Sequence, residues 1–186
     1  MKCCNTEYPD PHIVDGTAHF ICSVCWETRE IKNYREYTEQ ESIDDFEKEY
    51  GVKLPNRYLE LLNKSDCLVA KVPSTDIQSL KFYFGEGFYT LGEISGLNKY
   101  EYRSLFDSSY LSETWGLPDN LVLLDGDGHT WLSLDYRESA VDPKVILIES
   151  DECNSLVIAD NFEEFISRLI PYEKVYDREG NIIYDR

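Results

Sequence analysis

The cysteines near the start of the chain have the residue type and spacing of a zinc site. Cys22 and Cys25 form a C-x-x-C pair, and Cys3 and Cys4 precede it at about the separation expected between the halves of a zinc ribbon. Because cysteine thiolates are common zinc ligands, we expect these four residues to bind a structural zinc ion. Cys3 and Cys4 are adjacent, unlike a second C-x-x-C pair, so one ligand has possible substitutes in two histidines, His12 and His19.

Two other states of these cysteines remain open: free thiols in a flexible arm, or a redox-active pair. A redox C-x-x-C pair belongs to a thioredoxin-like strand–helix unit, which residues 27–35 do not clearly form. Residues 1–36 also contain few aliphatic side chains, so this segment cannot build a hydrophobic core of its own. It therefore needs a metal ion, or contacts with the rest of the chain, to become ordered.

A second group of residues that could do chemistry is the run Asp125-Gly-Asp-Gly-His129. Its two carboxylates could hold Mg²⁺ or Ca²⁺, and His129 could act as a base. A full calcium loop would need Glu at its twelfth position, where this chain has Tyr136. Asp and Gly are also typical of tight turns, and the sequence favours a turn between two strands. A metal-dependent hydrolase that uses Asp125, Asp127 and His129 is the least favoured function.

No other pattern in the chain indicates catalysis. The sequence contains neither a Gly-x-Ser-x-Gly nucleophile motif nor a phosphate-binding loop. Cys67 and Cys153 lie beside apolar runs, so they are expected to be packed thiols rather than nucleophiles. We therefore expect a protein that is not an enzyme.

The chain is strongly acidic, with 36 acidic residues against 18 lysines and arginines and a net charge of −18 over 186 residues. This charge repels nucleic acids and anionic membranes and attracts a basic partner, although acidity also serves solubility alone. No apolar run is long enough to cross a membrane, and the first residues lack the apolar core of a signal peptide. We therefore expect a cytoplasmic protein whose cysteines are reduced.

Two short amphipathic helices are predicted first. Ser42 is a good N-cap for the first helix, and Gly51 ends it. The second helix is predicted to start at Leu54-Pro55, because proline is tolerated in a first helical turn. Its apolar stripe consists of Leu54, Tyr58, Leu61 and Leu62.

The middle of the chain is less regular. We expect aromatic-rich strands over Leu80–Phe84 and Gly87–Leu91 and a helix over Glu93–Asp107, whereas Ser108–Pro118 is ambiguous. The remaining sequence predicts four strands, namely Leu121–Leu124, Thr130–Asp135, Val145–Glu149 and Ser155–Ile158. A closing helix starts near Asn161.

This order predicts an α+β fold, in which an antiparallel-dominated sheet packs against an N-terminal helix pair and a closing helix. The predicted organisation has three parts. Residues 1–36 form a Cys-rich, zinc-binding appendage, residues 41–170 form the α+β domain, and residues 171–186 form a C-terminal hairpin extension around Glu179-Gly180-Asn181.

The order and sequence of the predicted elements resemble those of the SUKH superfamily of Smi/Knr-like proteins over about residues 41–170. The first helices carry the family's Ile…Phe-Glu, Gly-x-x-Leu-Pro and Tyr-x-x-Leu-Leu pattern at Ile43, Phe46, Glu47, Gly51, Leu54, Pro55, Tyr58, Leu61 and Leu62. The later matches are Leu117-Pro118, Gly128, Trp131, Leu134, Asp135, Pro143, Val145, Ala159, Phe162, Phe165 and Ile166. One departure is the run Asn63–Asp66, where the family commonly has Asn-Gly-Gly.

The resemblance implies a mostly non-enzymatic domain. Many bacterial members are immunity proteins that bind a toxin domain, often a nuclease, and silence it, whereas others are regulatory binding modules. An acidic protein suits the first role, because it can occupy the basic groove in which a nuclease binds phosphates. We expect acidic and aromatic residues to contact such a basic toxin, although most aromatic residues could equally be core. The candidate residues are Tyr89, Asp107, Trp115, Asp125 and Asp127.

Overall fold

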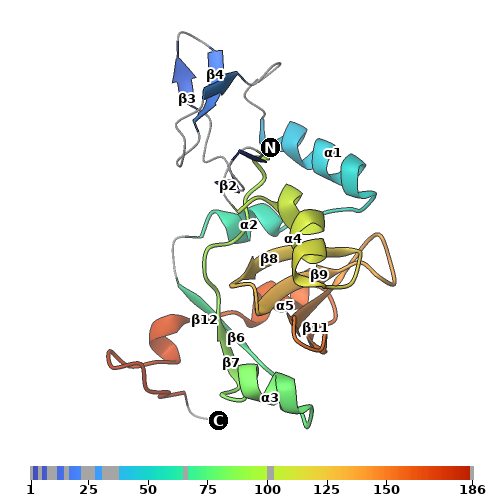
Figure 1. The fold of residues 1–186 in the computed structure, drawn as a ribbon. Helices are drawn as coiled ribbons and strands as arrows, with labels where there is room; N and C mark the ends of the chain where they lie inside the picture. The colour runs from blue at the N-terminus through green and yellow to red at the C-terminus, as the bar shows by residue number, and fades with distance from the viewer. Residues whose placement is uncertain are drawn as a thin grey trace.

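The computed structural model describes residues 38–64, 67–99 and 103–184, together with five short strands nearer the N-terminus (Figure 1). These strands are β1 (Lys2–Cys3), β2 (Thr6–Glu7), β3 (His12–Val14), β4 (Thr17–Ile21) and β5 (Thr28–Glu30). β1 pairs with β2, and β3, β4 and β5 form a small antiparallel sheet with β4 in the middle.

The central sheet consists of four antiparallel strands in the spatial order β11-β10-β9-β8. The strands are β8 (Leu121–Gly126), β9 (Thr130–Asp135), β10 (Lys144–Glu149) and β11 (Ser155–Ala159). All four fall on strands that the sequence predicts. Alternating residues point to opposite faces of a strand, so the sheet presents two apolar faces.

One face of this sheet forms the main core, and the other forms a smaller core. Leu132 and Leu134 belong to the main core, whereas Trp131 belongs to the smaller one. Helix α4 (Ser108–Trp115) packs against β8, and Leu111 and Trp115 contact the smaller core. Helix α5 (Phe162–Arg168) packs against β10, β11 and β6 and supplies three buried side chains, those of Phe162, Phe165 and Ile166.

The helix boundaries confirm two predicted caps and correct two starts. Helix α1 (Glu39–Tyr50) begins after Thr38, whose side chain forms a capping box with Glu41, and not at Ser42. It ends at Gly51 in the left-handed conformation, as expected. Helix α2 (Tyr58–Leu62) begins later than Leu54-Pro55, because residues 52–55 form an irregular segment and residues 56–57 a turn. Asn161 caps α5 by accepting a hydrogen bond from the Glu164 backbone.

A second sheet has the order β12-β6-β7, with β6 (Leu68–Lys71), β7 (Phe88–Thr90) and β12 (Ile170–Pro171). The strand expected over Leu80–Phe84 is wrong, since these residues belong to helix α3 (Gln78–Phe84). Leu80 and Phe84 are buried four residues apart on one helix face, whereas Phe82 is 78% exposed. The prediction failed because Leu80, Phe82 and Phe84 are apolar at every second position, which is also the pattern of a strand.

The helix expected over Glu93–Asp107 is also wrong within the described residues. They contain only a 3₁₀ turn, η1 (Leu105–Asp107), and Gly96 instead forms a parallel bridge with Ser104. The helix of this region is α4, which lies in the stretch Ser108–Pro118 that the sequence left ambiguous. A further 3₁₀ turn, η2 (Tyr172–Lys174), precedes the last residues, in which Tyr176 and Ile182 form a bridge around a turn.

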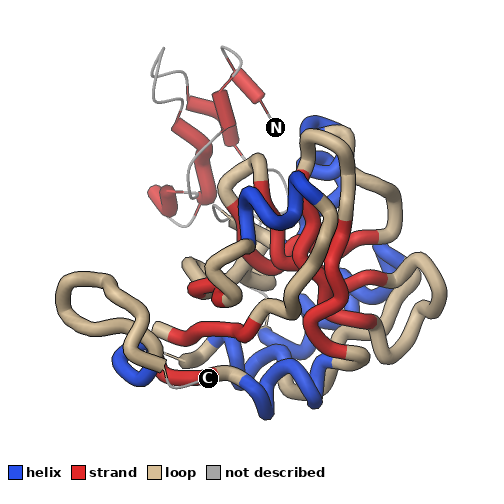
Figure 2. The backbone as a smooth tube through the Cα atoms, turned by 90° about the horizontal axis from the view of Figure 1, so that it is seen from below, coloured by secondary structure: helices blue, strands red, loops and turns tan. Residues whose placement is uncertain are grey.

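The architecture is therefore α+β with antiparallel sheets, as the sequence predicts. Figure 2 shows helices on both sides of the central strands and a loop near the C-terminus that projects away from them. Among the helices of the described residues, none is long and apolar enough to cross a membrane.

Candidate functional site

A shift in strand register places one carboxylate on the core side of the central sheet. Leu123 pairs with Ser133, but Asp125 pairs with Leu132, so Leu124 is an extra residue between them. Residues that lie opposite one another in a sheet share a face, and Asp125 therefore shares the main-core face with Leu132. The carboxylate of Asp125 is consequently buried, with 6% of the residue exposed.

Asp125 joins the central sheet to the second sheet through hydrogen bonds. Its Oδ2 accepts from the backbone N–H of Gly92 at 2.7 Å and from the hydroxyl of Tyr89 at 3.1 Å. Burial, followed by the charge of Asp125, raises the pKa of Tyr89 above its usual range, so the hydroxyl remains a donor. Its other oxygen, Oδ1, lies 3.5 Å from the Arg103 guanidinium.

A cavity of about 220 Å³ opens beside this carboxylate, and we call it the Asp125 cavity. Its lining comes from the segment before α4, from α4 itself, and from β8, β9 and the turn between them. The lining residues are Ser95, Arg103, Asp107, Leu111, Trp115, Asp125, Gly126, Asp127, Gly128 and Trp131. Four of the five partner-binding candidates thus line one cavity. The fifth, Tyr89, does not line it but donates a hydrogen bond to Asp125. In the sequence these residues were candidates only because they are acidic or aromatic, and nothing there indicated that they lie around one cavity.

The rings of Trp115 and Trp131 line the cavity. Gly126 and Gly128 allow these rings to pack directly against the backbone, because glycine has no Cβ atom. A Cβ atom on Gly126 would lie 2.4 Å from the Trp131 ring, and one on Gly128 would lie 2.4 Å from the Trp115 ring. The Trp131 Nε1–H also donates to the Gly128 carbonyl at 3.0 Å. The glycines of the Asp-Gly-Asp-Gly run are therefore required by packing as well as by the turn.

The same run forms the turn between β8 and β9 that the sequence favours. Asp127 Oδ1 accepts hydrogen bonds from the backbone N–H groups of His129 at 3.0 Å and Thr130 at 2.8 Å. The His129 ring lies against Trp115, and its Nδ1 is 3.9 Å from an Asp151 oxygen. Over the part of the chain that is described, no group of three or more His, Cys, Asp or Glu side chains is arranged to hold a metal ion.

The lining of the Asp125 cavity carries three carboxylates and one guanidinium, so its charge is negative. Asp107 also caps η1, because its Oδ2 accepts from the Ser104 backbone at 3.3 Å. Arg103 was not anticipated from the sequence. Its nearest signal was the capping pattern of Ser104 and Asp107, which marks the start of a helical turn immediately after Arg103.

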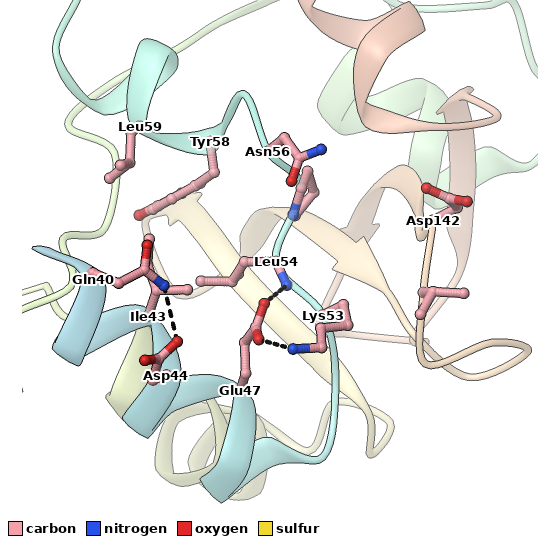
Figure 3. A pocket seen from close by; sticks show the side chains of 12 residues that line it. Gln40, Ile43, Asp44, Glu47, Lys53, Leu54, Asn56, Tyr58, Leu59 and Asp142 are labelled. Carbon is pink, nitrogen blue, oxygen red and sulfur yellow. Dashed lines mark hydrogen bonds and ion pairs between the residues drawn. The ribbon is translucent and has the colours of Figure 1, made fainter.

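A larger cavity of about 530 Å³ lies between α1, the turn before α2 and the loop between β9 and β10 (Figure 3). Gln40, Asp44 and Glu47 share the face of α1 that borders it, and Asp142 lies on the opposite side (Figure 3). Glu47 forms an ion pair with Lys53 and accepts from the Leu54 backbone at 3.0 Å. Gln40 donates to Asp44 at 2.9 Å. Glu47 thus secures the turn to α1, and none of the partner-binding candidates lines this cavity.

Most of the predicted zinc ligands lie outside the described residues, namely Cys4, Cys22 and Cys25. Cys3 belongs to β1, and the register of β3 with β4 places His12 opposite His19. The zinc site therefore stays a prediction.

A model of the SMI1/KNR4 family (SUKH-1) matches residues 37–168, which is well over half of the chain and includes the whole Asp125 cavity. This range agrees with the span of the SUKH resemblance. No curated protein and no solved structure matches the chain.

Proposed function

The chain belongs to the SMI1/KNR4 family (SUKH-1), and we propose that it is a non-enzymatic immunity protein that binds and neutralises a basic, nuclease-like bacterial toxin. One observation carries the choice of contact site: Asp107, Trp115, Asp125 and Asp127 line a single negatively charged cavity. Family membership is consistent with a protein-binding role of the immunity type. The proposed location of this binding is the cytoplasm.

Charge supports the proposed mode of inhibition. A nuclease needs a basic groove to hold phosphates, and a protein of net charge −18 can compete for that groove without any chemical step. Aromatic side chains within a polar rim are typical contact residues of tight interfaces. Trp115, which is partly exposed beside Asp127, has this combination.

The test begins with the gene's neighbourhood. If an adjacent gene encodes a large secreted protein with a basic C-terminal domain, that domain is co-expressed with this chain, and we expect co-purification and loss of the toxin's activity. The association rate should fall as salt is raised, because steering between opposite charges is screened. A salt-independent rate would contradict charge mimicry. An adjacent signalling gene, with no toxin nearby, would favour the alternative of a regulatory or scaffolding module.

A matched pair of variants locates the contact site. Asp127→Asn removes one charge from the Asp125 cavity, and Asn can preserve the turn through the same side-chain oxygen. Asp142→Asn removes one charge from the larger cavity, at a residue whose positive φ of 49° suits Asn. Both aspartates are exposed loop residues. We expect the first variant to weaken toxin binding and the second to leave it unchanged. The opposite pattern would move the contact site to the larger cavity.

A further inference from the structure

We propose that the outer edge of β11 binds an extended, basic segment of a partner protein as an additional strand of the central sheet. β11 lies at the opposite edge of this sheet from β8, which lines the Asp125 cavity. The inference goes beyond the proposed function, because it identifies a second contact surface with a different mode of binding. Its argument does not use the cavity.

The register of the central sheet determines which backbone groups of β11 point outward. The Glu149 N–H donates to the Asn154 carbonyl at 3.1 Å, so this pair of residues is hydrogen-bonded between β10 and β11. Bonded and non-bonded pairs alternate along an antiparallel ladder, so Leu156 also bonds to β10. The N–H and C=O groups of Ser155 and Val157 therefore point away from β10.

These outward groups have no partner in the part of the chain that the structure describes. There, no hydrogen bond from a turn, a loop or a side chain reaches the backbone of Ser155 or Val157. Val157 is also 42% exposed. The bulge in the pairing of β11 with β10 lies beyond Val157, so the strand is regular up to that residue. Both residues thus offer a donor and an acceptor to another strand.

The other edge of the sheet, β8, is protected. The Leu123 N–H donates to the Ser108 hydroxyl at 3.0 Å, and the Leu124 carbonyl accepts from the Ser95 N–H at 2.7 Å. Proteins also protect edge strands with charged residues or proline. β11 has the sequence Ser-Leu-Val-Ile-Ala, which contains neither. β11 is therefore the edge of the central sheet that can accept a strand.

A side chain of the added strand can pack on Val157. Val157 lies opposite Ile146, which belongs to the smaller core, so it continues the apolar face of the sheet at an exposed margin. A residue of the added strand that pairs with Val157 shares this face. An apolar side chain at that position would bury Val157.

The residues on either side of β11 are acidic. Residues 150–164 contain no lysine or arginine, and their acidic members are Asp151, Glu152, Asp160, Glu163 and Glu164. Glu163 and Glu164 each form an ion pair with an arginine. Within the described residues, Glu152 and Asp160, which flank the strand, have no ion pair of this kind.

Lys144 of β10 is a cation close to this region. Its ammonium is held by Glu138 at 2.7 Å, which raises the pKa of Lys144 together with a smaller contribution from Asp160. The charge around β11 therefore remains negative. A segment that carries lysine or arginine on both sides of a short apolar run is complementary to this edge.

The same charges disfavour a second copy of this chain as the occupant. Antiparallel pairing of two β11 strands about a twofold axis would bring Glu152 of one copy toward Asp160 of the other. Each copy also has a net charge of −18. Because like charges repel, the edge fits a basic segment better than it fits itself.

The test uses the full protein and synthetic peptides. The probe is acetyl-Lys-Val-Lys-Val-Lys-Val-Lys-amide, which can form a strand with its valines on one face. In one comparison peptide proline replaces each valine, which keeps the charge but removes strand pairing. In another, glutamate replaces each lysine. Binding is followed by NMR, from chemical shifts and from the hydrogen exchange of the Ser155 and Val157 amides. The Leu156 amide, which faces β10, is the internal control.

Val157→Pro removes one outward N–H, and proline is tolerated on an edge strand at such a position. Val157→Thr is the matched control, because it keeps this N–H and the β-branched shape. Ser155→Lys is a second variant, which adds a like charge to the edge and keeps both N–H groups, and Ser155→Glu is its control. The melting temperature of each variant checks that it is folded.

We expect the basic probe to slow exchange at Ser155 and Val157 and to leave Leu156 unchanged. Val157→Pro should bind this probe roughly tenfold more weakly, which corresponds to about one lost backbone hydrogen bond, whereas Val157→Thr should bind it nearly as the unmodified protein does. Ser155→Lys should weaken binding and Ser155→Glu should not. The glutamate peptide should not bind.

Three peptide results would each overturn the inference: equal binding of the proline peptide, unchanged exchange at Ser155 and Val157, or equal binding by Val157→Pro and Val157→Thr. A dimer of the unmodified protein in light scattering that Val157→Pro dissociates would also overturn it, because a second copy would then be the occupant. The proposed function fails separately. If the toxin is bound through Asp127 but no peptide binds, only this inference falls. If the basic probe binds at β11 but the toxin does not bind, only the immunity role falls.

Discussion

The hydroxyl of Tyr89 donates a hydrogen bond to Asp125 at 3.1 Å, and this bond ties the second sheet to the central sheet. The two residues are 36 positions apart in the chain and meet because Asp125 is turned toward the main core. The bond lies behind the Asp125 cavity and keeps the carboxylate in place.

Tyr89→Phe should lower the free energy of unfolding. The stability of the variant should also fall less steeply than that of the unmodified protein as pH rises into the alkaline range. Losing the bond should lower the free energy of unfolding by about 0.5–1.5 kcal/mol. The folded state raises the pKa of Tyr89 above its usual value of 10.0, so an unfolded chain releases this proton first as pH rises. Stability from Tyr89 is therefore complete below about pH 10 and declines above it. Urea unfolding between pH 8 and about 10.5 should show a shallower decline in the variant.

Asp125→Ala should be more damaging than Tyr89→Phe, because it removes the charged acceptor of two hydrogen bonds instead of one. The Gly92 N–H and the Tyr89 hydroxyl both donate to this carboxylate. A hydrogen bond to a charged group contributes about 1.5–3 kcal/mol to stability. Urea unfolding at neutral pH measures this loss, and Asp142→Asn, at an exposed loop residue whose positive φ Asn tolerates, should change stability by less than about 1 kcal/mol. Equal losses in the two variants would mean that Asp125 does not hold the sheets together.

Gly128→Ala should destabilise the turn between β8 and β9 and disturb the cavity wall. An added Cβ would lie 2.4 Å from the Trp115 ring, and the φ of +101° is already unfavourable for alanine. Crowding of this kind costs about 1–3 kcal/mol beyond the backbone strain. Gly51→Ala is the matched control, because Gly51 also has positive φ, +67°, but no atom within 4 Å of the added Cβ. Thermal unfolding of both variants should separate crowding from strain, and equal melting temperatures would contradict the packing of Trp115 on Gly128.

Glu149 should make stability depend on acidic pH. Burial by itself would raise its pKa, but hydrogen bonds from the backbones of Glu152 and Asn154 and from the Ser79 hydroxyl outweigh burial and lower it. The stabilising contribution of Glu149 is therefore present above its unfolded pKa, near 4.5, and is lost as pH falls through the lower, folded value. Glu149→Gln should unfold more readily at neutral pH and show a smaller loss of stability from pH 5 to about pH 3. An unchanged acid slope would contradict this assignment.

The N-terminal cysteines should bind one zinc ion per chain. Purified protein should contain zinc by mass spectrometry of the metal content, and Cys22→Ser should release it, because Cys22 belongs to the C-x-x-C pair. Cys153→Ser is the control, since the Cys153 thiol instead donates to the Gly116 carbonyl at 3.1 Å. Absence of zinc from protein prepared without chelators, or its retention in Cys22→Ser, would favour free thiols.

Local patterns were sufficient for much of the fold. Leu132 and Leu134 point to one core and Trp131 to the other, as their alternation predicts, because a strand of strict period two leaves no other arrangement. Asn161 begins helix α5 and Gly51 ends helix α1, where side-chain and backbone chemistry require. Around Phe82 the same reasoning was wrong, since apolar residues at alternate positions suit a strand while the fold buries Leu80 and Phe84 on one side of a helix.

By itself, the sequence determined the α+β class, the family resemblance, the acidic charge and the residue types suited to a basic partner. Only the tertiary structure decided that these residues meet. The extra residue at Leu124 turns Asp125 toward Tyr89, and the loop that ends at Arg103 brings a cation to the same place. The reason is that periodicity and propensity act over a few neighbouring residues, whereas a cavity depends on side chains from distant segments whose positions are set by packing.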